Sequence, residues 1–283
     1  MKIVECPRDA MQGLHEFIAT DVKVNYINQL LKVGFDTLDM GSFVSPRAIP
    51  QMRDTAEVLD RIDLTLTDTK LLTIVGNERG AKTAAQIEQG DYLGFPFSIS
   101  ETFQKRNINS SIEDSFHRAE DILNTCVIHQ KDLVVYISMA FGNPYNDPWN
   151  ADIVLEWTHK LHNELGVEII SLSDTIGAAQ PETIDYLFKS LIPELPNVEL
   201  GAHLHTTPNT WEEKVHAAVQ AGCVRFDGAL KGYGGCPMAK DDLTGNMPTE
   251  NLLDYFERKK IEANIQKEEF FKSLAQTQNV FPI

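Results

Sequence analysis

Two histidines, His203 and His205, lie two residues apart in the stretch GAHLHTT at residues 201–207. Side chains at positions i and i+2 of a β-strand share one face, so the two imidazoles would point to the same place. Two imidazoles on one face can bind a metal ion together. Alternatively, one histidine packs in the core while the other contacts solvent. Other parts of the chain must decide between these interpretations.

Two oxygen-bearing side chains could complete a metal site. Asp9 offers a charged carboxylate and Asn246 a neutral amide oxygen. Together with two imidazole nitrogens, these oxygens favour a six-coordinate divalent ion, Mg²⁺ or Mn²⁺, over structural zinc. Each residue also has a structural alternative, since Asp9 can form a salt bridge with Arg8 and Asn246 can cap a turn or a helix. Considered together, the residues favour the metal site.

The elements that would position these residues repeat one pattern, a short apolar run followed by a longer amphipathic segment. Such alternation predicts parallel strands joined by helices, and therefore an α/β fold. We expect a (β/α)8 TIM barrel with a C-terminal helical extension, and the alternative is a doubly wound open sheet. The apolar runs cover residues 2–7, 36–43, 70–76, 92–98, 133–141, 167–174, 198–205 and 223–230, and helical patterns cover 21–34, 111–129, 149–166, 181–192 and 210–222.

The chain shows no linker rich in Gly, Ser or Pro, so we expect a single barrel domain over residues 1–283. C-terminal helices are expected at about 250–278. The tail at residues 259–278 has the pattern of one charged amphipathic helix, which would either cover the barrel or join a partner chain. We expect a homodimer or a higher homo-oligomer.

Active sites of TIM barrels lie at the C-terminal ends of the strands, so polar residues at those ends should meet on one rim. Such residues follow or end the first, second, sixth, seventh and eighth apolar runs. These residues are Arg8, Asp9 and Gln12, then Asp39 and Ser42, then Asp174 and Thr175, then His203 and His205, and finally Cys236 and Asn246.

The segment at residues 231–246, KGYGGCPMAKDDLTGN, contains four glycines and one cysteine. This composition is typical of a loop that can close over a site. Cys236 is then a candidate reactive thiol, although an inert thiol is equally common in such a context. The segment lacks the GxxxxGK[ST] pattern, so a nucleotide-binding P-loop is not supported.

The bulk composition limits the possible partners and the compartment. A formal net charge of −16 disfavours nucleic acid and anionic membranes, because phosphate binding depends on clustered Lys and Arg. No window approaches the roughly 20 apolar residues of a membrane span. The four cysteines form no CxxC pair, which fits a reducing cytoplasm better than a disulfide framework. We therefore expect a soluble cytoplasmic protein with no nucleic-acid or membrane partner.

The sequence resembles the 3-hydroxy-3-methylglutaryl-CoA lyase family, within the metal-dependent barrel superfamily that includes isopropylmalate synthase and homocitrate synthase. The loop GGCP followed by GN and TE, with SFVSP near the second run, is more specific to the lyases than to the synthases. The similarity extends along nearly the whole chain, in ECPRDAMQG near the start, SFVSPRAIPQM (42–52), SISETFQKRNINSSIEDSF (98–116), SLSDTIG (171–177), GAHLHTT and GGCPMAKDDLTGNMPTE (234–250).

The resemblance implies cleavage of 3-hydroxy-3-methylglutaryl-CoA to acetyl-CoA and acetoacetate, a step of leucine degradation and ketone-body formation. Asp9 or Asp174 would take the hydroxyl proton, and the residues do not decide between them. Arg8 would stabilise charge on the thioester oxygen, and Cys236 would protonate the enolate carbon. The implied metal ligands are Asp9, His203, His205 and Asn246, and the candidate CoA-binding residues, which could also be solvated surface charges, are Arg47, Lys105 and Arg106.

Three departures from the family pattern leave other activities open. Asp39 stands where the family typically has Glu, Thr206 stands where it usually has Asp, and the loop between Cys236 and Asn246 is one residue longer. The first alternative is a related metal-dependent aldolase or acyl-CoA condensing enzyme, acting on another hydroxyacyl-CoA or on a 2-oxoacid. The second is a barrel that binds an acyl-CoA without turnover.

Overall fold

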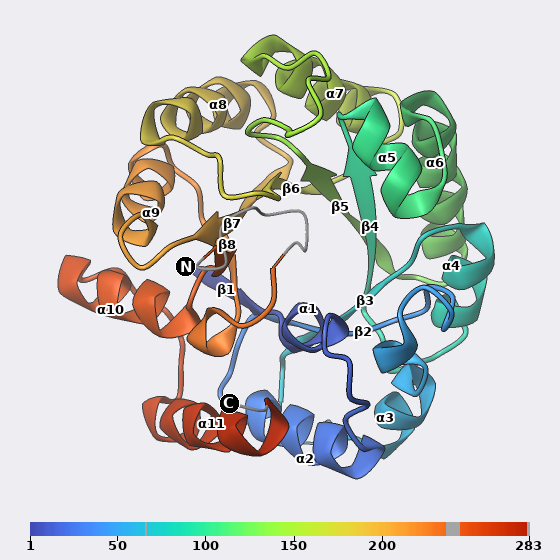
Figure 1. The fold of residues 1–283 in the computed structure, drawn as a ribbon, viewed down its shortest axis with the longest axis vertical. Helices are drawn as coiled ribbons and strands as arrows, with labels where there is room; N and C mark the ends of the chain where they lie inside the picture. Colours follow the sequence, from blue (N-terminus) through green and yellow to red (C-terminus); the bar gives the residue numbers. More distant parts are fainter. Residues whose placement is uncertain (66, 236–243, 282–283) are drawn as a thin grey trace.

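The computed structural model describes residues 1–65, 67–235 and 244–281 of the chain. Within these residues, eight parallel strands form a closed barrel, because β1 pairs with both β2 and β8 (Figure 1). Closure excludes the doubly wound open sheet and confirms the TIM barrel. The strands are β1 (Lys2–Glu5), β2 (Thr37–Ser42), β3 (Lys70–Ile74), β4 (Tyr92–Ser98), β5 (Asp132–Ser138), β6 (Ile169–Asp174), β7 (Glu199–Thr206) and β8 (Arg225–Gly228).

Helices form an outer ring around the barrel (Figure 1). Four of them begin at a polar residue whose side chain accepts a hydrogen bond from the backbone N–H three residues later, which satisfies a free donor of the first turn. No helix in the described part of the chain is both long and apolar enough to cross a membrane. The helices are α1 (Pro7–Gln12), α2 (Thr20–Leu31), α3 (Thr55–Arg61), α4 (Glu78–Ala85), α5 (Glu101–Ile108), α6 (Ile112–Ile128), α7 (Ala151–Asn163), α8 (Pro181–Glu194), α9 (Trp211–Gln220), α10 (Thr249–Lys259) and α11 (Lys267–Val280), with short 3-10 turns η1 (Pro50–Met52) and η2 (Leu230–Gly232).

The first strand is shorter than its apolar run, because helix α1 starts inside that run. Pro7 occupies the first turn of α1, where a missing N–H costs no hydrogen bond. Arg8 and Asp9 follow directly and are buried. The early start of α1 therefore places both residues at the C-terminal end of β1.

A short strand connects the end of the glycine-rich segment to the barrel. This strand, β9 (Gly245–Asn246), is antiparallel to β7, with Asn246 opposite His205. The pairing fixes the position of Asn246 relative to the histidines, although the two segments are distant in sequence.

The expectation of one continuous helix at residues 259–278 is wrong. Helix α10 ends at Lys259, and Lys260 adopts a left-handed conformation with φ of 57°. The Gln266 N–H then donates to the Val33 carbonyl oxygen, and α11 starts only at Lys267. Ile261 and Ile265 in the connecting segment pack against the hydrophobic core, which the helical pattern does not reveal. Helix α11 covers α2 on the outside of the barrel (Figure 1).

Candidate metal centre and active site

His203 and His205 share the inner face of β7, with ring centroids 5.4 Å apart. Asp9 approaches them from α1, and one ligand atom from each of these three residues lies within 4.8 Å of the others. The Nδ1 atom of His205 is buried and has no hydrogen-bond partner among the described residues. A buried imidazole nitrogen without a partner beside a carboxylate is the environment of a metal ligand.

Asn246 approaches the same point from β9. Its Nδ2 atom donates to Asp9 Oδ2 at 2.7 Å and to the carbonyl oxygen of Tyr233 at 2.9 Å. Both amide hydrogens are therefore used, and Oδ1 is the atom left to act as a ligand. Two imidazole nitrogens, a carboxylate and an amide oxygen form a mixed donor set that fits a divalent cation of six-coordinate preference.

The electrostatics of the cluster keep two of these groups in the protonation state that a metal needs. Burial opposes ionisation of Asp9, but Arg8 and the two imidazoles hold the pKa of this carboxyl below its usual range. Burial and the neighbouring His203 lower the pKa of His205 to about 4. At neutral pH, Asp9 is thus a carboxylate and His205 a neutral imidazole.

Arg8 is held in one orientation by two carboxylates and an amide. Its Nε donates to both oxygens of Asp39 at 3.1 Å, and its Nη2 also donates to Asp39. Its Nη1 donates to Asp9 Oδ1 and to Gln12 Oε1, each at 2.9 Å. Burial alone would lower the pKa of Arg8, but Asp39 and Asp9 raise it. Burial raises the pKa of Asp39, although the guanidinium of Arg8 opposes this shift. The arrangement provides a fixed, permanently charged guanidinium at the rim.

His203 contacts a second carboxylate, that of Asp227. Its Nδ1 lies 3.1 Å from Asp227 Oδ2, so this nitrogen donates and Nε2 is left for a metal. Burial opposes protonation of His203, but Asp227 raises its pKa. Cys6, His203 and Asp227 form a second group close enough to hold an ion. Burial raises the pKa of the Cys6 thiol well above its usual value, which makes this group a poor site for a hard cation.

Asp174 lies at the end of β6 and is bound by a lysine rather than by the cluster of Asp9 and the histidines. Its Oδ2 accepts from Lys214 Nζ at 2.7 Å, and its Oδ1 accepts from the Ala179 backbone N–H at 3.0 Å. Burial raises the pKa of Asp174 despite this ion pair. Lys214 also donates to the carbonyl oxygen of His205 at 2.8 Å, which connects Asp174 to the metal centre through the backbone of β7.

Cys236 lies outside the described residues, but both ends of its loop are described. Glu5, buried on β1, accepts from the Leu230 N–H at 2.8 Å and from Thr249 Oγ1 at 2.5 Å. One carboxyl group therefore joins the segment before the loop to the helix after it. Burial raises the pKa of Glu5 to about 8, although these two hydrogen bonds lower it.

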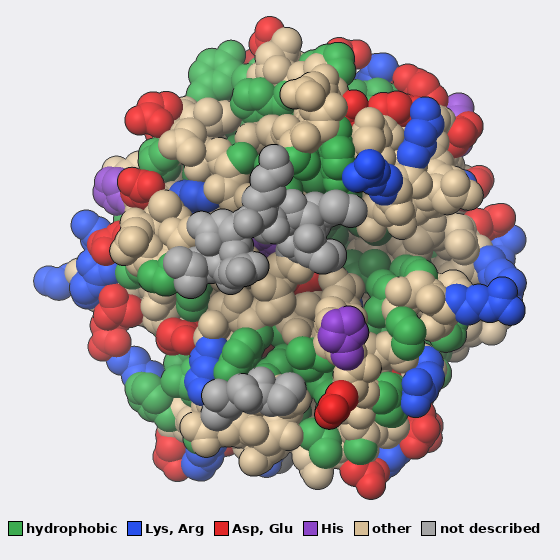
Figure 2. Space-filling view, in the orientation of Figure 1, with side chains coloured by type: hydrophobic (Ala, Val, Ile, Leu, Met, Phe, Trp, Pro, Cys, Tyr) green, Lys and Arg blue, Asp and Glu red, His purple; other side chains and the backbone are tan. Residues whose placement is uncertain are grey.

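The three candidate CoA-binding residues follow β2 and β4 and are exposed. Basic side chains are visible over α5 on the face shown in Figure 2. Lys105 is 63% exposed and pairs with Glu101 at 2.9 Å, and the Arg106 guanidinium lies 4.8 Å from the ring centroid of Tyr145. Arg47 is exposed in the segment after β2. These side chains are accessible to a large anionic ligand, and none of them reaches the metal centre.

Sequence reasoning missed three residues that support the site: Asp227, Lys214 and Glu5. Asp227 alternates with Arg225 on β8, so strand periodicity could have placed it inside the barrel beside the histidines. Lys214 lies four residues before Ala218 on the buried face of α9, where a cation needs a partner. Glu5 gave no such signal, since its burial depends on contacts with α10.

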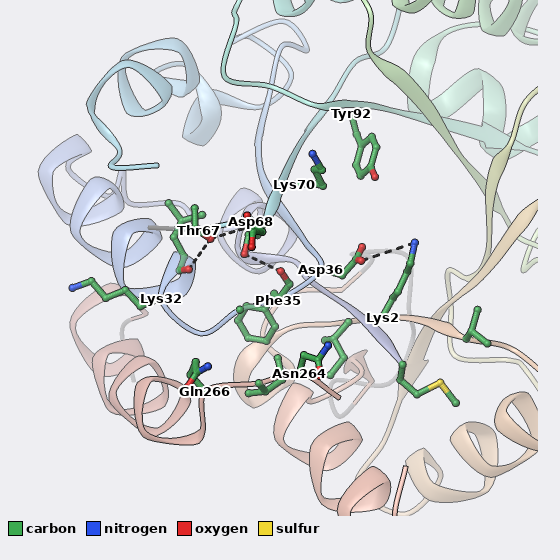
Figure 3. Close-up of a pocket in the computed structure, with 17 residues that line it drawn as sticks. Lys2, Lys32, Phe35, Asp36, Thr67, Asp68, Lys70, Tyr92, Asn264 and Gln266 are labelled. Atoms are coloured by element: carbon green, nitrogen blue, oxygen red, sulfur yellow. Dashed lines mark hydrogen bonds and ion pairs between the residues drawn. The ribbon is translucent and has the colours of Figure 1, made fainter. Parts of the chain in front are cut away.

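A cavity of about 850 Å³ lies at the opposite end of the barrel, where β1, β3 and β4 begin. Lys2, Lys70 and Tyr92 line it, and Lys2 approaches Asp36 at 4.0 Å (Figure 3). None of the residues of the metal centre lines this cavity. In TIM barrels the chemistry occurs at the C-terminal ends of the strands, so the metal centre is the stronger candidate for the active site.

Three comparisons agree on the relatives of this chain. The HMGL-like family model matches residues 2–279. Hydroxymethylglutaryl-CoA lyase YngG of Bacillus subtilis is 33% identical over 267 residues, which cover 94% of this chain and 88% of the relative. The crystal structure of the Bacillus subtilis HMG-CoA lyase superposes with a TM-score of 0.91 at 30% identity, covering 98% of this chain and 92% of that one. An HMG-CoA lyase from Acinetobacter baumannii, in complex with coenzyme A and 3-methylmalate, superposes with a TM-score of 0.90 at 29% identity, covering 99% and 90%.

Proposed function

Since the chain belongs to the HMGL-like family, we propose that it is a carbon–carbon lyase that cleaves 3-hydroxy-3-methylglutaryl-CoA to acetyl-CoA and acetoacetate. The observation that carries this proposal is the convergence of Asp9, His203, His205 and Asn246 beside Arg8 at the mouth of the barrel. Relatives named as lyases of this substrate, one of them with coenzyme A bound, support the choice of substrate class.

The donor set fits a divalent metal, and we propose Mg²⁺ or Mn²⁺ held by Asp9, His203, His205 and Asn246. When bound, such an ion polarises oxygen atoms of a substrate and lowers the pKa of a hydroxyl group. The hydrogen bonds from Asn246 to Asp9 and from His203 to Asp227 orient the ligands before the ion arrives.

The proton on the C3 hydroxyl must leave for the C2–C3 bond to break. We favour Asp9 over Asp174 as the group that accepts it, because Asp9 lies in the metal centre, whereas Asp174 is connected to that centre through Lys214 and the backbone of β7. Cleavage of the bond leaves a ketone and a thioester enolate. Arg8, held by Asp39 and Gln12, would face the negative charge that develops on the thioester oxygen.

Cys236 would complete the reaction by donating its thiol proton to the enolate carbon. The described segments before and after this cysteine are joined by Glu5, which accepts from the Leu230 N–H and from Thr249 Oγ1. Arg47, Lys105 and Arg106 would bind the phosphates of CoA, since they are exposed cations after β2 and β4 on an acidic protein.

A related aldolase or condensing activity is the second candidate. Asp39 and Thr206 support it, because both differ from the lyase pattern and both are buried, Asp39 within β2 and Thr206 at the end of β7. A synthase would consume acetyl-CoA and a 2-oxoacid and release free CoA, whereas the lyase consumes one thioester.

The proposal for the lyase also includes its setting in the cell. We propose a cytoplasmic homo-oligomer with a role in leucine degradation and ketone-body formation.

The test is acetoacetate release from 3-hydroxy-3-methylglutaryl-CoA, with Mg²⁺ or Mn²⁺ and then with excess EDTA. The Cys236→Ala and His205→Ala variants should each lose at least a hundredfold in kcat/KM. The matched controls are Cys126→Ala on α6 and His129→Ala just after it, which should keep the activity of the unchanged protein. Turnover that survives EDTA would contradict the metal, and binding of the thioester without any turnover would favour a non-catalytic acyl-CoA binder.

A further inference from the structure

Polar residues of β5 to β8 form two layers in the barrel, and the upper layer contains the candidate metal ligand His203. In the lower layer, strand register places Tyr136 beside Ser171, Ser171 beside Gly201, and Gly201 beside Arg225. In the upper layer, His203 lies between Ser173 and Asp227. Tyr136 also packs against an apolar cluster of Leu72, Ile74 and Val134. The metal ligand His203 therefore lies directly above a layer that contains a buried arginine.

Arg225 is 0% exposed and is only partly satisfied. Its Nη1 lies 2.9 Å from Glu199 Oε1 and 3.6 Å from Asp36 Oδ1, at the end of the barrel that carries the cavity of Figure 3. Its Nε and Nη2 have no partner among the described residues. A Cβ atom at Gly201 would lie 3.1 Å from Arg225 Cδ, so the glycine leaves room for the arginine side chain.

Four other buried atoms in the two layers also have no hydrogen-bond partner among the described residues: Tyr136 OH, Ser171 Oγ, Ser173 Oγ and Asp227 Oδ1. Buried polar atoms almost always have a hydrogen-bond partner. A set that combines free donors of Arg225 with a free carboxylate oxygen and three hydroxyl groups suits an internal water molecule, which needs two to four polar neighbours. Arg225 and Asp227 form no direct ion pair, so water is the species that can join them.

We propose that Arg225 is a positioning residue for the metal centre and acts on His203 through an internal water and Asp227. The water accepts from Arg225 and donates to Asp227 Oδ1, which fixes the carboxylate. Asp227 Oδ2 then accepts from His203 Nδ1 and leaves Nε2 of that ring directed at the metal. Glu199, which also accepts from Lys2 Nζ at 2.5 Å, holds the far end of the arginine. This inference rests on the proposed function, because it requires that the centre binds a metal.

The test measures the Kd for Mn²⁺ by the electron paramagnetic resonance signal of free Mn²⁺, so it does not depend on turnover. Arg225→Met and Asp227→Asn should each raise the Kd by about 10- to 100-fold, which is the usual effect of removing an outer partner of a metal ligand. The Kd of the double variant should be no higher than that of the single variant with the higher Kd, because both changes break the same chain of contacts. Additive losses would overturn the proposal, as would an unchanged Kd in Arg225→Met.

Two further variants keep the test decisive. Arg225→Lys retains the charge near Glu199 but lacks the donors Nε and Nη2, so it should raise the Kd for Mn²⁺ about tenfold. This variant provides the test if Arg225→Met does not fold. Lys23→Met is the matched control: it removes another buried cation, which pairs with Asp54 at 2.7 Å far from the centre, and should leave the Kd within about twofold. If the unchanged protein does not bind Mn²⁺, the proposed function itself fails. If it binds and the Arg225 variants match it, only this inference fails.

Discussion

Lys214 Nζ lies 2.7 Å from Asp174 Oδ2, and the two side chains are 2% and 1% exposed. The same ammonium group donates to the carbonyl oxygens of Gly177 and His205. One cation on α9 therefore joins the end of β6, the loop after it and the backbone of a candidate metal ligand on β7. Its three donors are all used, which is the condition under which a buried lysine is tolerated.

Removal of this cation should strongly destabilise the fold. The Lys214→Met variant leaves the Asp174 carboxylate buried without its partner, and such a change typically costs about 3–5 kcal/mol of the free energy of unfolding. Urea-induced unfolding measures the loss. The Lys214→Met/Asp174→Asn double variant should recover part of it, because no uncompensated charge is left.

The control for this prediction is an exposed pair of the same types. Lys189 and Asp185 on α8 lie 2.8 Å apart, and their side chains are 59% and 37% exposed. Lys189→Met should change the free energy of unfolding by less than about 1 kcal/mol. A loss for Lys214→Met as small as that of Lys189→Met would contradict the structural role of Lys214.

The barrel could be predicted from the sequence because its strands are short apolar runs separated by helical patterns, and β4 matches its run at residues 92–98. The histidines could be paired because a strand has a period of two. The contacts of Asp174 with Lys214 could not be predicted, since neither the register between β6 and β7 nor the packing of α9 is encoded in local periodicity. The break between α10 and α11 was missed because alternating polar and apolar residues at 261–266 do not exclude a helix.

The contact between Asp39 and Arg8 yields a prediction on catalysis. Asp39→Asn weakens the bidentate contact that holds the guanidinium, so kcat should fall by about 10- to 100-fold while KM changes little. Steady-state kinetics with 3-hydroxy-3-methylglutaryl-CoA measures both constants. Asp39→Glu, which restores the residue typical of the lyase pattern, should retain more of kcat than Asp39→Asn. An unchanged kcat in Asp39→Asn would show that the orientation of Arg8 does not limit the reaction.

Asn246 yields a prediction on metal-dependent stability. In Asn246→Asp, a carboxylate replaces the amide that donates to Asp9 Oδ2 and to Tyr233 O. The new carboxylate would repel the charge of Asp9 and the lone pairs of the Tyr233 carbonyl oxygen. Without metal, the free energy of unfolding of this variant should be about 1–3 kcal/mol lower than that of the unchanged protein. Saturating Mn²⁺ should raise its Tm by more than it raises that of the unchanged protein, because the cation offsets the repulsion. Asn107→Asp on the exposed end of α5 is the control, and an equal response of both variants to Mn²⁺ would contradict a metal at this position.

Glu5 yields a prediction on pH. Its pKa is about 8 in the folded protein and near 4.5 when the chain is unfolded, so between these values the folded state holds a proton that the unfolded state releases. The contribution of Glu5 to stability is therefore complete below pH 4.5 and is lost as the pH rises towards 8, by up to about 1.4 kcal/mol per pH unit. Glu5→Gln cannot titrate, so its free energy of unfolding should fall less steeply than that of the unchanged protein between pH 5 and 8.

Urea unfolding at one-unit intervals of pH measures this difference. All other titrating groups are common to both proteins, so the gap between the two curves isolates Glu5. The control is Glu182→Gln in the first turn of α8, which removes an exposed carboxylate and should leave the curve parallel to that of the unchanged protein. Parallel curves for Glu5→Gln as well would mean that Glu5 is ionised throughout this range. In that case it would join Leu230 to Thr249 as a carboxylate, and the anchoring of the loop ends would not depend on pH.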